Sequence, residues 1–522
     1  MTGETPTTGH EHRWFIAFAV VLASMMQVID ASIVNVAIPH MMGELGASLD
    51  EIAWVSTGYI VSSVIVMPMT AWLAAYFGRK RYFAASIILF TVASFFCGAS
   101  HSLGALIAWR IVQGIGGGAL ITTSQALLLE VFPPEEIGTA MALFGLGVMV
   151  GPTLGPTLGG WLTDAYSWPW IFYINLPIGV VAALMVVAYV HDAEHHVKAS
   201  SVDWPGIALL ILTVGALQYV LEHGQRDGWF ESSRIVVLSV TAVTSAVLLV
   251  RRELSVPEPV IDFRVLRHRE MAIGTLVGVF FGLALFGSVF VLPVFLQGML
   301  RMTAWQTGMV ILPGALATAA SMAVVGRLAR RFDSRPVIMT GMVLFFVAMW
   351  QLSHITAASG ANDFFWPLIW RGLGLGMMFV PLTNLTLASL QRREVGAGAA
   401  LSNFARQLGG SLGIAGMATM LTRFTREARF VLGDHIGGAD PAALERVTLM
   451  SRAFLARGMD AGTAQRAAYT VMERQVAAQA SVVAFSKVYL MSGAILLATL
   501  PLLFLVRGGR RRGPAGVTVH AE

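Results

Sequence analysis

The sequence is poor in charged residues. Asp, Glu, Lys and Arg together make up 12% of its 522 residues, whereas 56% are hydrophobic. Globular domains in water carry about 25% charged residues. The composition therefore excludes a soluble protein and indicates a membrane protein with many spans.

Two further absences exclude classes of function. The only lysines are Lys80, Lys198 and Lys487, and none of them ends a glycine-rich loop that could cradle ATP phosphates. Direct ATP hydrolysis is therefore excluded, and an ion gradient remains as the energy source. The His-Glu-x-x-His pattern of zinc proteases is also missing, which argues against an enzyme. We expect no metal ion and no cofactor.

Cysteine is nearly absent as well. Cys97 is the single cysteine, so no internal disulfide can form. It lies in an apolar stretch, which favours a role in packing.

Apolar runs of about 20 residues recur along the chain, and each is long enough to cross a bilayer as a helix. The first run is too long for a cleavable signal and leads directly into a second, so we interpret it as a signal-anchor. We count fourteen runs, at about 14–38, 52–75, 82–99, 105–129, 138–162, 168–190, 204–222, 234–250, 271–297, 305–326, 336–354, 364–390, 396–420 and 486–506.

The basic residues indicate the orientation. The net charge of +5 could suggest nucleic acid, but Arg and Lys are concentrated in alternate short connections, such as 79–81 and 251–252. The intervening short connections carry only Arg226, Arg234 and Arg301. Because short cytoplasmic loops are rich in Arg and Lys, we predict that both termini are cytoplasmic. We expect no nucleic-acid partner.

The sequence repeats itself weakly. Trp370-Arg371 with the glycines that follow resembles Trp109-Arg110 with its glycines, and the connection after the tenth run resembles the one after the second. We therefore predict an all-α membrane protein with two six-helix bundles and two inserted helices. The predicted divisions are 1–200, the insert 201–265, and 266–522 with a long outer loop over 421–485. Ala and Leu lie between the charged residues of this loop, so we expect it to be partly helical and solvated. It either docks a partner or caps an exit, or it is a tolerated insertion.

Asp30 is the most informative single residue. It lies inside the first apolar run, where a charge costs at least about 2.5 to 3.5 kcal/mol. At about 1.5 Å per residue, Asp30 and Arg110 both lie about 6 to 10 Å outward of the membrane centre, so they can meet. Arg110 favours the ionised carboxylate and apolar surroundings favour the protonated one, so a change of environment could load and release a proton. A fixed structural ion pair, or a purely structural Asp30, is the alternative.

The fifth run contains a stripe of glycines with two prolines beside it. Residues four apart share one helix face, and a face without side chains lets another helix approach closely. Prolines remove helical hydrogen bonds and bend the helix. The combination favours a helix that rocks, although packing alone would explain the glycines. The residues are Gly147, Gly151, Pro152, Gly155, Pro156 and Gly159.

Further polar side chains are predicted at membrane depth. They are candidates for the lining of a substrate cavity, or each is satisfied by a neighbouring backbone group. These candidates are Gln27, Asn35, Gln113, Asn384, Arg406 and Gln407.

Five stretches together resemble a known family. They are Asp30-Ala-Ser-Ile-Val-Asn-Val-Ala-Ile-Pro39, Phe77-Gly78-Arg79-Lys80, Arg110-Ile-Val-Gln-Gly114, the glycine-proline run 151–160, and the stretch 401–411. The chain resembles the major facilitator superfamily, specifically its fourteen-span drug:proton antiporters of the EmrB type. The run in the fifth span marks exporters in that family. The resemblance also implies an inner-membrane location, a periplasmic adaptor of the EmrA type and an outer-membrane channel of the TolC type.

The chain departs from the family pattern in one place. The connection after the second span normally carries Gly, Asp and Arg where this chain has Ala71, Ala75 and Tyr76. Gly78 and Arg79 remain, and the resemblance implies that they form a cytoplasmic gating loop.

These observations predict a proton-coupled multidrug efflux transporter for hydrophobic, chemically varied compounds, which works by alternating access. Asp30 would take protons from the outside, and Arg110 would adjust the affinity of Asp30 for these protons. A dedicated exporter of one metabolite or lipid is an alternative in the same fold. A membrane sensor or scaffold that transports nothing is an alternative from another class.

Overall fold

A computed structural model describes residues 12–133, 136–190, 202–328, 333–391, 394–435 and 441–506, and these contain helices and no strands. Each of the fourteen apolar runs lies mostly in helix. The α-helices are α1 (Arg13–Leu45), α2 (Leu49–Phe77), α3 (Arg79–Gly98), α4 (Leu103–Val131), α5 (Ile137–Ala165), α6 (Trp170–Tyr173), α7 (Asn175–Tyr189), α8 (Trp204–His223), α9 (Ser233–Ser255), α10 (Arg269–Gly298), α11 (Ala304–Leu328), α12 (Ser334–Leu352), α13 (Phe365–Leu387), α14 (Val395–His435), α15 (Pro441–Leu455), α16 (Ala461–Leu497) and α17 (Leu500–Leu505). The 3₁₀ turns are η1 (Trp229–Glu231), η2 (Phe263–Arg267) and η3 (Ala361–Phe364).

The helices confirm a multi-pass membrane protein. Within the described residues, 12 helical stretches are long and apolar enough to cross a membrane. They comprise α1 to α4, the α6–α7 pair, α8 to α13, and the α16–α17 pair. Helices α5 and α14 are also long but fall outside this set, so the count of fourteen spans is not confirmed.

Polar side chains at the helix ends explain several of the boundaries. Ser48 and Glu51 form a capping box at the start of α2: the Ser48 hydroxyl accepts from the Glu51 amide, and the Glu51 carboxylate accepts from the Ser48 amide. Such reciprocal bonds satisfy the free amides of a first turn. Gly46 ends α1 at φ 62°, and Gly78 separates α2 from α3 at φ 89°. Both values lie in the left-handed region that favours glycine.

The helices pack in two corresponding sets. In the first set α1 packs on α5, and α2 and α3 pack on α4; in the second α10 packs on α14, and α11 and α12 pack on α13. The two sets meet where α5 packs on α11 and where α2 packs on α14. At the first of these contacts, Gly138 and Gly326 approach so closely that a Cβ on either would collide with the carbonyl of the other.

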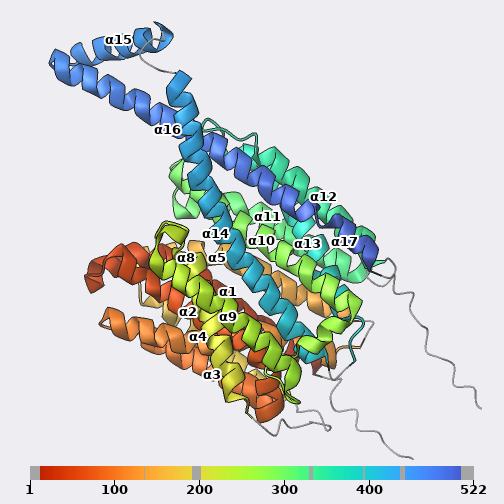
Figure 1. The fold of residues 1–522 in the computed structure, drawn as a ribbon. Coiled ribbons are helices and arrows are strands. Elements are labelled where there is room, and N and C mark those ends of the chain that lie inside the picture. Colours follow the sequence, from red (N-terminus) through yellow and green to blue (C-terminus); the bar gives the residue numbers. More distant parts are fainter. Residues whose placement is uncertain are drawn as a thin grey trace, which may run out of the picture.

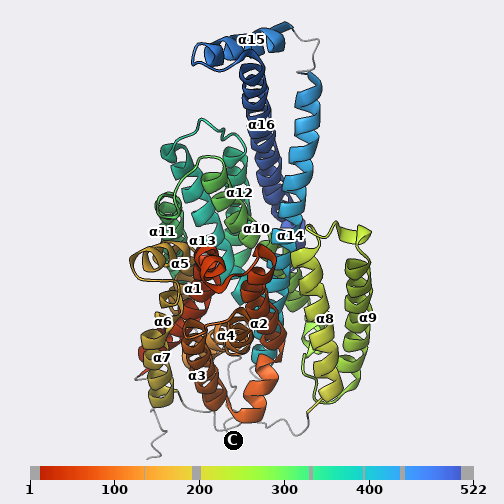
Figure 2. The same ribbon diagram turned by 90° about the vertical axis from the view of Figure 1, so that its left-hand side faces the viewer.

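Helices α8 and α9 stand at one flank of the molecule (Figure 2). They pack on each other, and α8 also contacts α2 and α14. The inserted pair is therefore attached to both sets mainly through α8.

The segment predicted as a long outer loop, 421–485, is largely helical in its described part. Helices α14 and α16 continue beyond the bundle and α15 lies across their ends (Figure 1). An ion pair joins Arg429 to Glu473, and Lys487 Nζ lies 3.7 Å from Glu427 Oε2. Ala, Leu, Arg and Glu recur here and favour helix, so α14 and α16 extend without interruption.

Candidate functional site: a buried carboxylate among three donors

Asp30 lies in α1 and is fully buried, with 0% of its surface exposed. Its Oδ2 accepts a hydrogen bond from Arg110 Nη1 at 2.6 Å. Its Oδ1 accepts from Gln113 Nε2 and from Asn175 Nδ2, both at 2.9 Å. The carboxylate therefore accepts hydrogen bonds from side chains of both α4 and α7.

Arg110 is held in place by several groups besides the carboxylate. Its Nε donates to the carbonyl oxygen of Val55 in α2 at 3.0 Å, and its Nη1 also donates to Gln113 Oε1 at 2.8 Å. The guanidinium carbon lies 4.2 Å from the centre of the Tyr59 ring. A planar guanidinium can stack flat on a ring while its N–H groups donate in fixed directions, a geometry that the compact ammonium of lysine does not have.

The hydrogen bonds continue from the carboxylate into α3. Asn175 Nδ2 also lies 3.1 Å from Ser94 Oγ, and Ser94 Oγ donates to the carbonyl oxygen of Phe172 at 2.9 Å. Cys97 Sγ lies 3.5 Å from Gln113 Oε1. The side chain of Cys97 is buried, and it contacts this cluster in addition to packing.

The structure brings Asp30, Arg110 and Gln113 together, and their role in proton coupling stays a prediction. Sequence reasoning missed Asn175 and Tyr59. An amide inside the apolar sixth run was the available signal for Asn175. Nothing in the sequence distinguished Tyr59 from an ordinary packed aromatic residue.

The glycine stripe of α5 faces α1. The facing residues of α1 are Val21, Val28, Ser32 and Ile33. A Cβ on Gly155 would collide with the Ser32 side chain, and a Cβ on Gly159 would stand 2.9 Å from the Ile33 carbonyl oxygen. The absence of side chains on this face of α5 therefore permits the close approach of the two helices. The same face of α5 carries Gly151 one turn before Gly155 and Gly147 two turns before it, and these approach Val28 and Val21 of α1.

The prolines beside the stripe do not interrupt α5, which runs unbroken from Ile137 to Ala165. Pro156 is half-buried. The side chain of Pro152 lies outside the described residues. Rocking of this helix stays a prediction.

The loop between α2 and α3 is tied to α4. Gly78 holds the turn, and Arg79 forms an ion pair with Glu130 near the end of α4. The acid that the usual family pattern would place at Ala75 is thus absent, and an acid from another helix pairs with Arg79. The gating role of Gly78 and Arg79 stays a prediction.

The other predicted cavity residues do not join the Asp30 cluster. Gln27 is buried, and its Oε1 accepts from the Ile121 amide at 3.2 Å. Asn35 is exposed, whereas Asn384 and Gln407 are half-buried, and none of these three side chains forms a hydrogen bond with another described residue.

Arg406 is buried without a carboxylate. Its guanidinium carbon lies 4.8 Å from the centre of the Phe379 ring, its Nη2 lies 3.5 Å from Thr383 Oγ1, and its Nε has no partner among the described residues. Close to it in sequence, Asn403 Nδ2 donates to Gln125 Oε1 of α4 at 2.6 Å. This buried bond joins the two helix sets, and sequence reasoning missed it.

The residue of the second helix set that corresponds to Arg110 has no acidic partner among the described residues. Arg371 occupies the matching place in α13 and is buried, but its Nε and Nη1 have no partner among the described residues. The only acidic residue of α10, which matches α1, is Glu270 in its first turn. The ion pair at membrane depth is therefore a feature of the first helix set.

A sequence profile of the Major Facilitator Superfamily matches residues 20–414. The chain is 33% identical to the multidrug export protein EmrB of Escherichia coli (strain K12), over 97% of this chain and 97% of that protein. The chain belongs to the major facilitator superfamily. It is also 28% identical to the fatty acid resistance protein FarB of Neisseria gonorrhoeae, over 98% of this chain and 99% of that protein.

This major facilitator is a membrane transporter and not an enzyme. Its fold is also similar to that of the human organic anion transporter MFSD10 (TETRAN), with a TM-score of 0.58 and 13% identity over 94% of this chain and 100% of that chain. At this identity the likeness shows the fold alone. Among the described residues, no His, Cys, Asp and Glu side chains gather into a group that could hold a metal ion.

Proposed function

We propose that this transporter exports hydrophobic, chemically varied compounds across the inner membrane in exchange for protons. The observation that supports this most strongly is the buried Asp30 with its three donors from Arg110, Gln113 and Asn175. A structural carboxylate would be a costly way to join helices at this depth.

We propose a coupling step that uses these hydrogen bonds. In this proposal a proton leaves Asp30 when Arg110, Gln113 and Asn175 close around its carboxylate. Protonation is favoured when helix movement withdraws Arg110, because apolar surroundings then disfavour the charge. One carboxylate can in this way take a proton on one side and release it on the other.

We propose that alternating access moves the two helix sets against each other at the α5–α11 and α2–α14 contacts. The close approach of Gly138 and Gly326 supports this, because backbone contacts of this kind have no long side chains to disentangle. In this proposal α5 and α14 also cross the membrane, which gives fourteen spans. Both termini are cytoplasmic, and α15 lies outside.

Substrates and partners are proposed from the relatives. EmrB is a multidrug export protein and FarB a fatty acid resistance protein, which supports hydrophobic cargo. FarB also favours the second candidate, a dedicated exporter of one lipid-like compound. The projecting end of α14, α15 and α16 is where we place a periplasmic adaptor of the EmrA type and, through it, a TolC-type channel.

The test uses purified protein in proteoliposomes with an imposed pH gradient. We expect Asp30→Asn to bind a hydrophobic dye as the parent does but to lose gradient-driven transport, because the amide keeps the shape and cannot titrate. Glu445→Gln, the same change on the exposed surface of α15, is the matched control. Full transport by Asp30→Asn would refute proton coupling through Asp30. Binding without any flux in the parent would instead favour the sensor or scaffold.

A further inference from the structure

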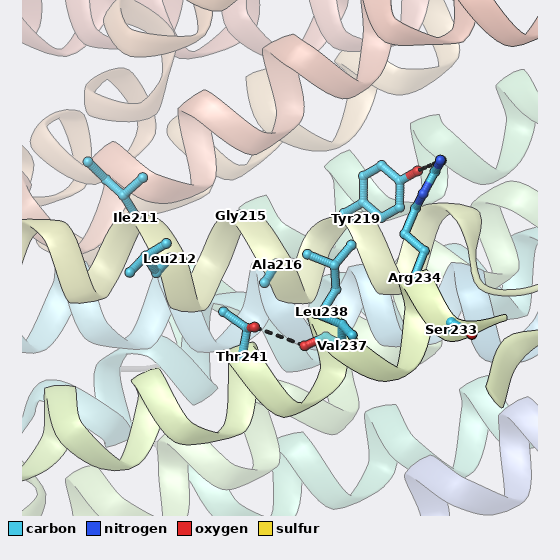
Figure 3. A pocket seen from close by; sticks show the side chains of 10 residues that line it. All are labelled: Ile211, Leu212, Gly215, Ala216, Tyr219, Ser233, Arg234, Val237, Leu238 and Thr241. Atoms are coloured by element: carbon cyan, nitrogen blue, oxygen red, sulfur yellow. Dashed lines mark hydrogen bonds between the residues drawn. The ribbon is translucent and has the colours of Figure 1, made fainter.

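An open groove of about 810 Å³ lies between α8 and α9, away from the Asp30 cluster (Figure 3). This size falls within the range of about 300–1,000 Å³ that is usual for ligand sites. One wall is the face of α8 from Ile211 to Tyr219, and the other is the face of α9 from Ser233 to Thr241. The side chains between its two ends are mostly apolar.

The groove has the length of one lipid leaflet. Ile211 and Tyr219 are eight residues apart in sequence, which corresponds to about 12 Å along a helix. Half of a hydrocarbon core of about 30 Å is about 15 Å. Gly215 lies in the middle of the α8 wall, and a Cβ added there would meet nothing within 4 Å. The groove is therefore open at the level where an acyl chain would lie.

Arg234 lies at the end of the groove nearest η1 and is the one charged residue among the described residues that line the groove. Arg234 is exposed in the first turn of α9 and donates one hydrogen bond, to Tyr219 Oη at 3.2 Å (Figure 3). Ser232 caps α9 without a side-chain bond, so the first amides of the helix are available to an anion. Asp227 acts on Arg234 through its charge but forms no ion pair with it among the described residues.

We propose that this groove binds an anionic phospholipid in the leaflet on the α15 side. The phosphate contacts Arg234 and the amino end of α9, and one acyl chain lies across Gly215. A phospholipid is favoured over a small anion because the apolar wall continues from the positive end over the depth of a leaflet. The lipid would also fasten α9, which packs chiefly on α8.

The test measures lipid retained by delipidated protein in native mass spectra, with dioleoyl phosphatidylglycerol or dioleoyl phosphatidylcholine added back. We expect one saturable phosphatidylglycerol site that phosphatidylcholine fills less well. Gly215→Leu places a side chain in the groove at a position where its Cβ meets nothing within 4 Å, and Arg234→Gln removes the charge. Each should weaken phosphatidylglycerol binding about tenfold, through lost apolar contact and a lost phosphate partner respectively.

Two control variants have no role in the groove. Gly416→Leu places the same side chain at another glycine with open space, and Arg474→Gln removes an exposed arginine on the same side. Both should bind phosphatidylglycerol as the parent does, and all four variants should elute as the parent does in size-exclusion chromatography. Misfolding of Gly215→Leu leaves Arg234→Gln as the deciding variant.

Three results would overturn the proposal. The first is unchanged phosphatidylglycerol binding in a folded Gly215→Leu or Arg234→Gln variant. The second is competition by inorganic phosphate, which would make the site one for a free anion. The third is one-for-one displacement by a transported dye, which would make the groove part of the substrate route.

Discussion

The packing of α5 on α1 can be tested by replacing Gly159 with alanine and comparing the result with the same replacement at a glycine that has free space. A Cβ at Gly159 would stand 2.8 Å from Ile33 Cγ1 and 2.9 Å from its carbonyl oxygen, whereas ordinary contacts begin at 3.4 Å. The helices must then separate by about 0.5 Å, because a carbonyl oxygen cannot rotate away as a side-chain end can. Gly278 in α10 is the matched site, because a Cβ there meets nothing within 4 Å.

The two substitutions are predicted to change the stability of the protein in opposite directions. Alanine in a helix interior is about 0.5–1 kcal/mol more favourable than glycine, so Gly278→Ala should stabilise the protein by up to that amount. At Gly159 the same gain is opposed by overpacking of about 1–3 kcal/mol. The net effect of Gly159→Ala is therefore a destabilisation of roughly 0.5–2 kcal/mol.

The assay is thermal unfolding of each variant in the same detergent, followed by the loss of the monodisperse peak in size-exclusion chromatography. We expect the Tm to rise for Gly278→Ala and to fall for Gly159→Ala. If both substitutions raised the Tm equally, the reasoning would be refuted, because the α1–α5 contact would then have room for a methyl group.

Three further predictions concern polar contacts. Arg110→Lys should lower gradient-driven transport about tenfold or more, because an ammonium cannot reproduce all the bonds of the guanidinium fork; parental flux would contradict this. Asn403→Leu should destabilise the protein by about 1–3 kcal/mol, because the buried Gln125 Oε1 would lose its donor. In a thermal unfolding series, adding Gln125→Leu should recover most of this loss. An equal loss in the double variant would show that the hydrogen bond does not contribute to stability. Burial raises the pKa of Asp203 at the start of α8, but hydrogen bonds and the charge of Arg252 outweigh it and hold that pKa below its usual range. The Asp203–Arg252 pair should therefore contribute its full stability above the usual Asp pKa of about 4 and lose this contribution as the pH falls through the lower pKa of the folded state. Asp203→Asn should then make the Tm fall less steeply at acid pH. An unchanged fall of the Tm at acid pH would contradict this prediction.

The sequence predicted helices well because a transmembrane helix satisfies all of its own backbone hydrogen bonds. A run of apolar residues is then sufficient to locate it, and depth along a helix follows from residue number. This is why Asp30 and Arg110 could be matched in depth before any contact was known. It is also why the face of the glycine stripe could be predicted, although its partner helix could not.

Apart from the Asp30–Arg110 pair, contacts between helices distant in sequence were not predicted. Asn175 and Gln125 are uncharged amides in apolar runs, and nothing in their neighbourhood identifies their partners. The pairing of Arg79 with Glu130 depends on how α3 and α4 pack, which residue order does not specify. The helical extension of α14 was predicted only in part. Ala and Leu among the charged residues of 421–485 favour helix, but they do not specify that α14 continues unbroken to His435.

The position of Asp30 on α1 connects the glycine stripe with the proposed proton site. Val28 and Ser32, the residues two before and two after Asp30, are the ones that contact Gly151 and Gly155 of α5. The donors to Asp30, in contrast, come from α4 and α7. A shift of α5 that carries α1 with it therefore moves the carboxylate relative to its donors, without any change in the donors themselves. Because α5 also packs on α11 of the other helix set, movement between the two sets would reach Asp30 through this stripe.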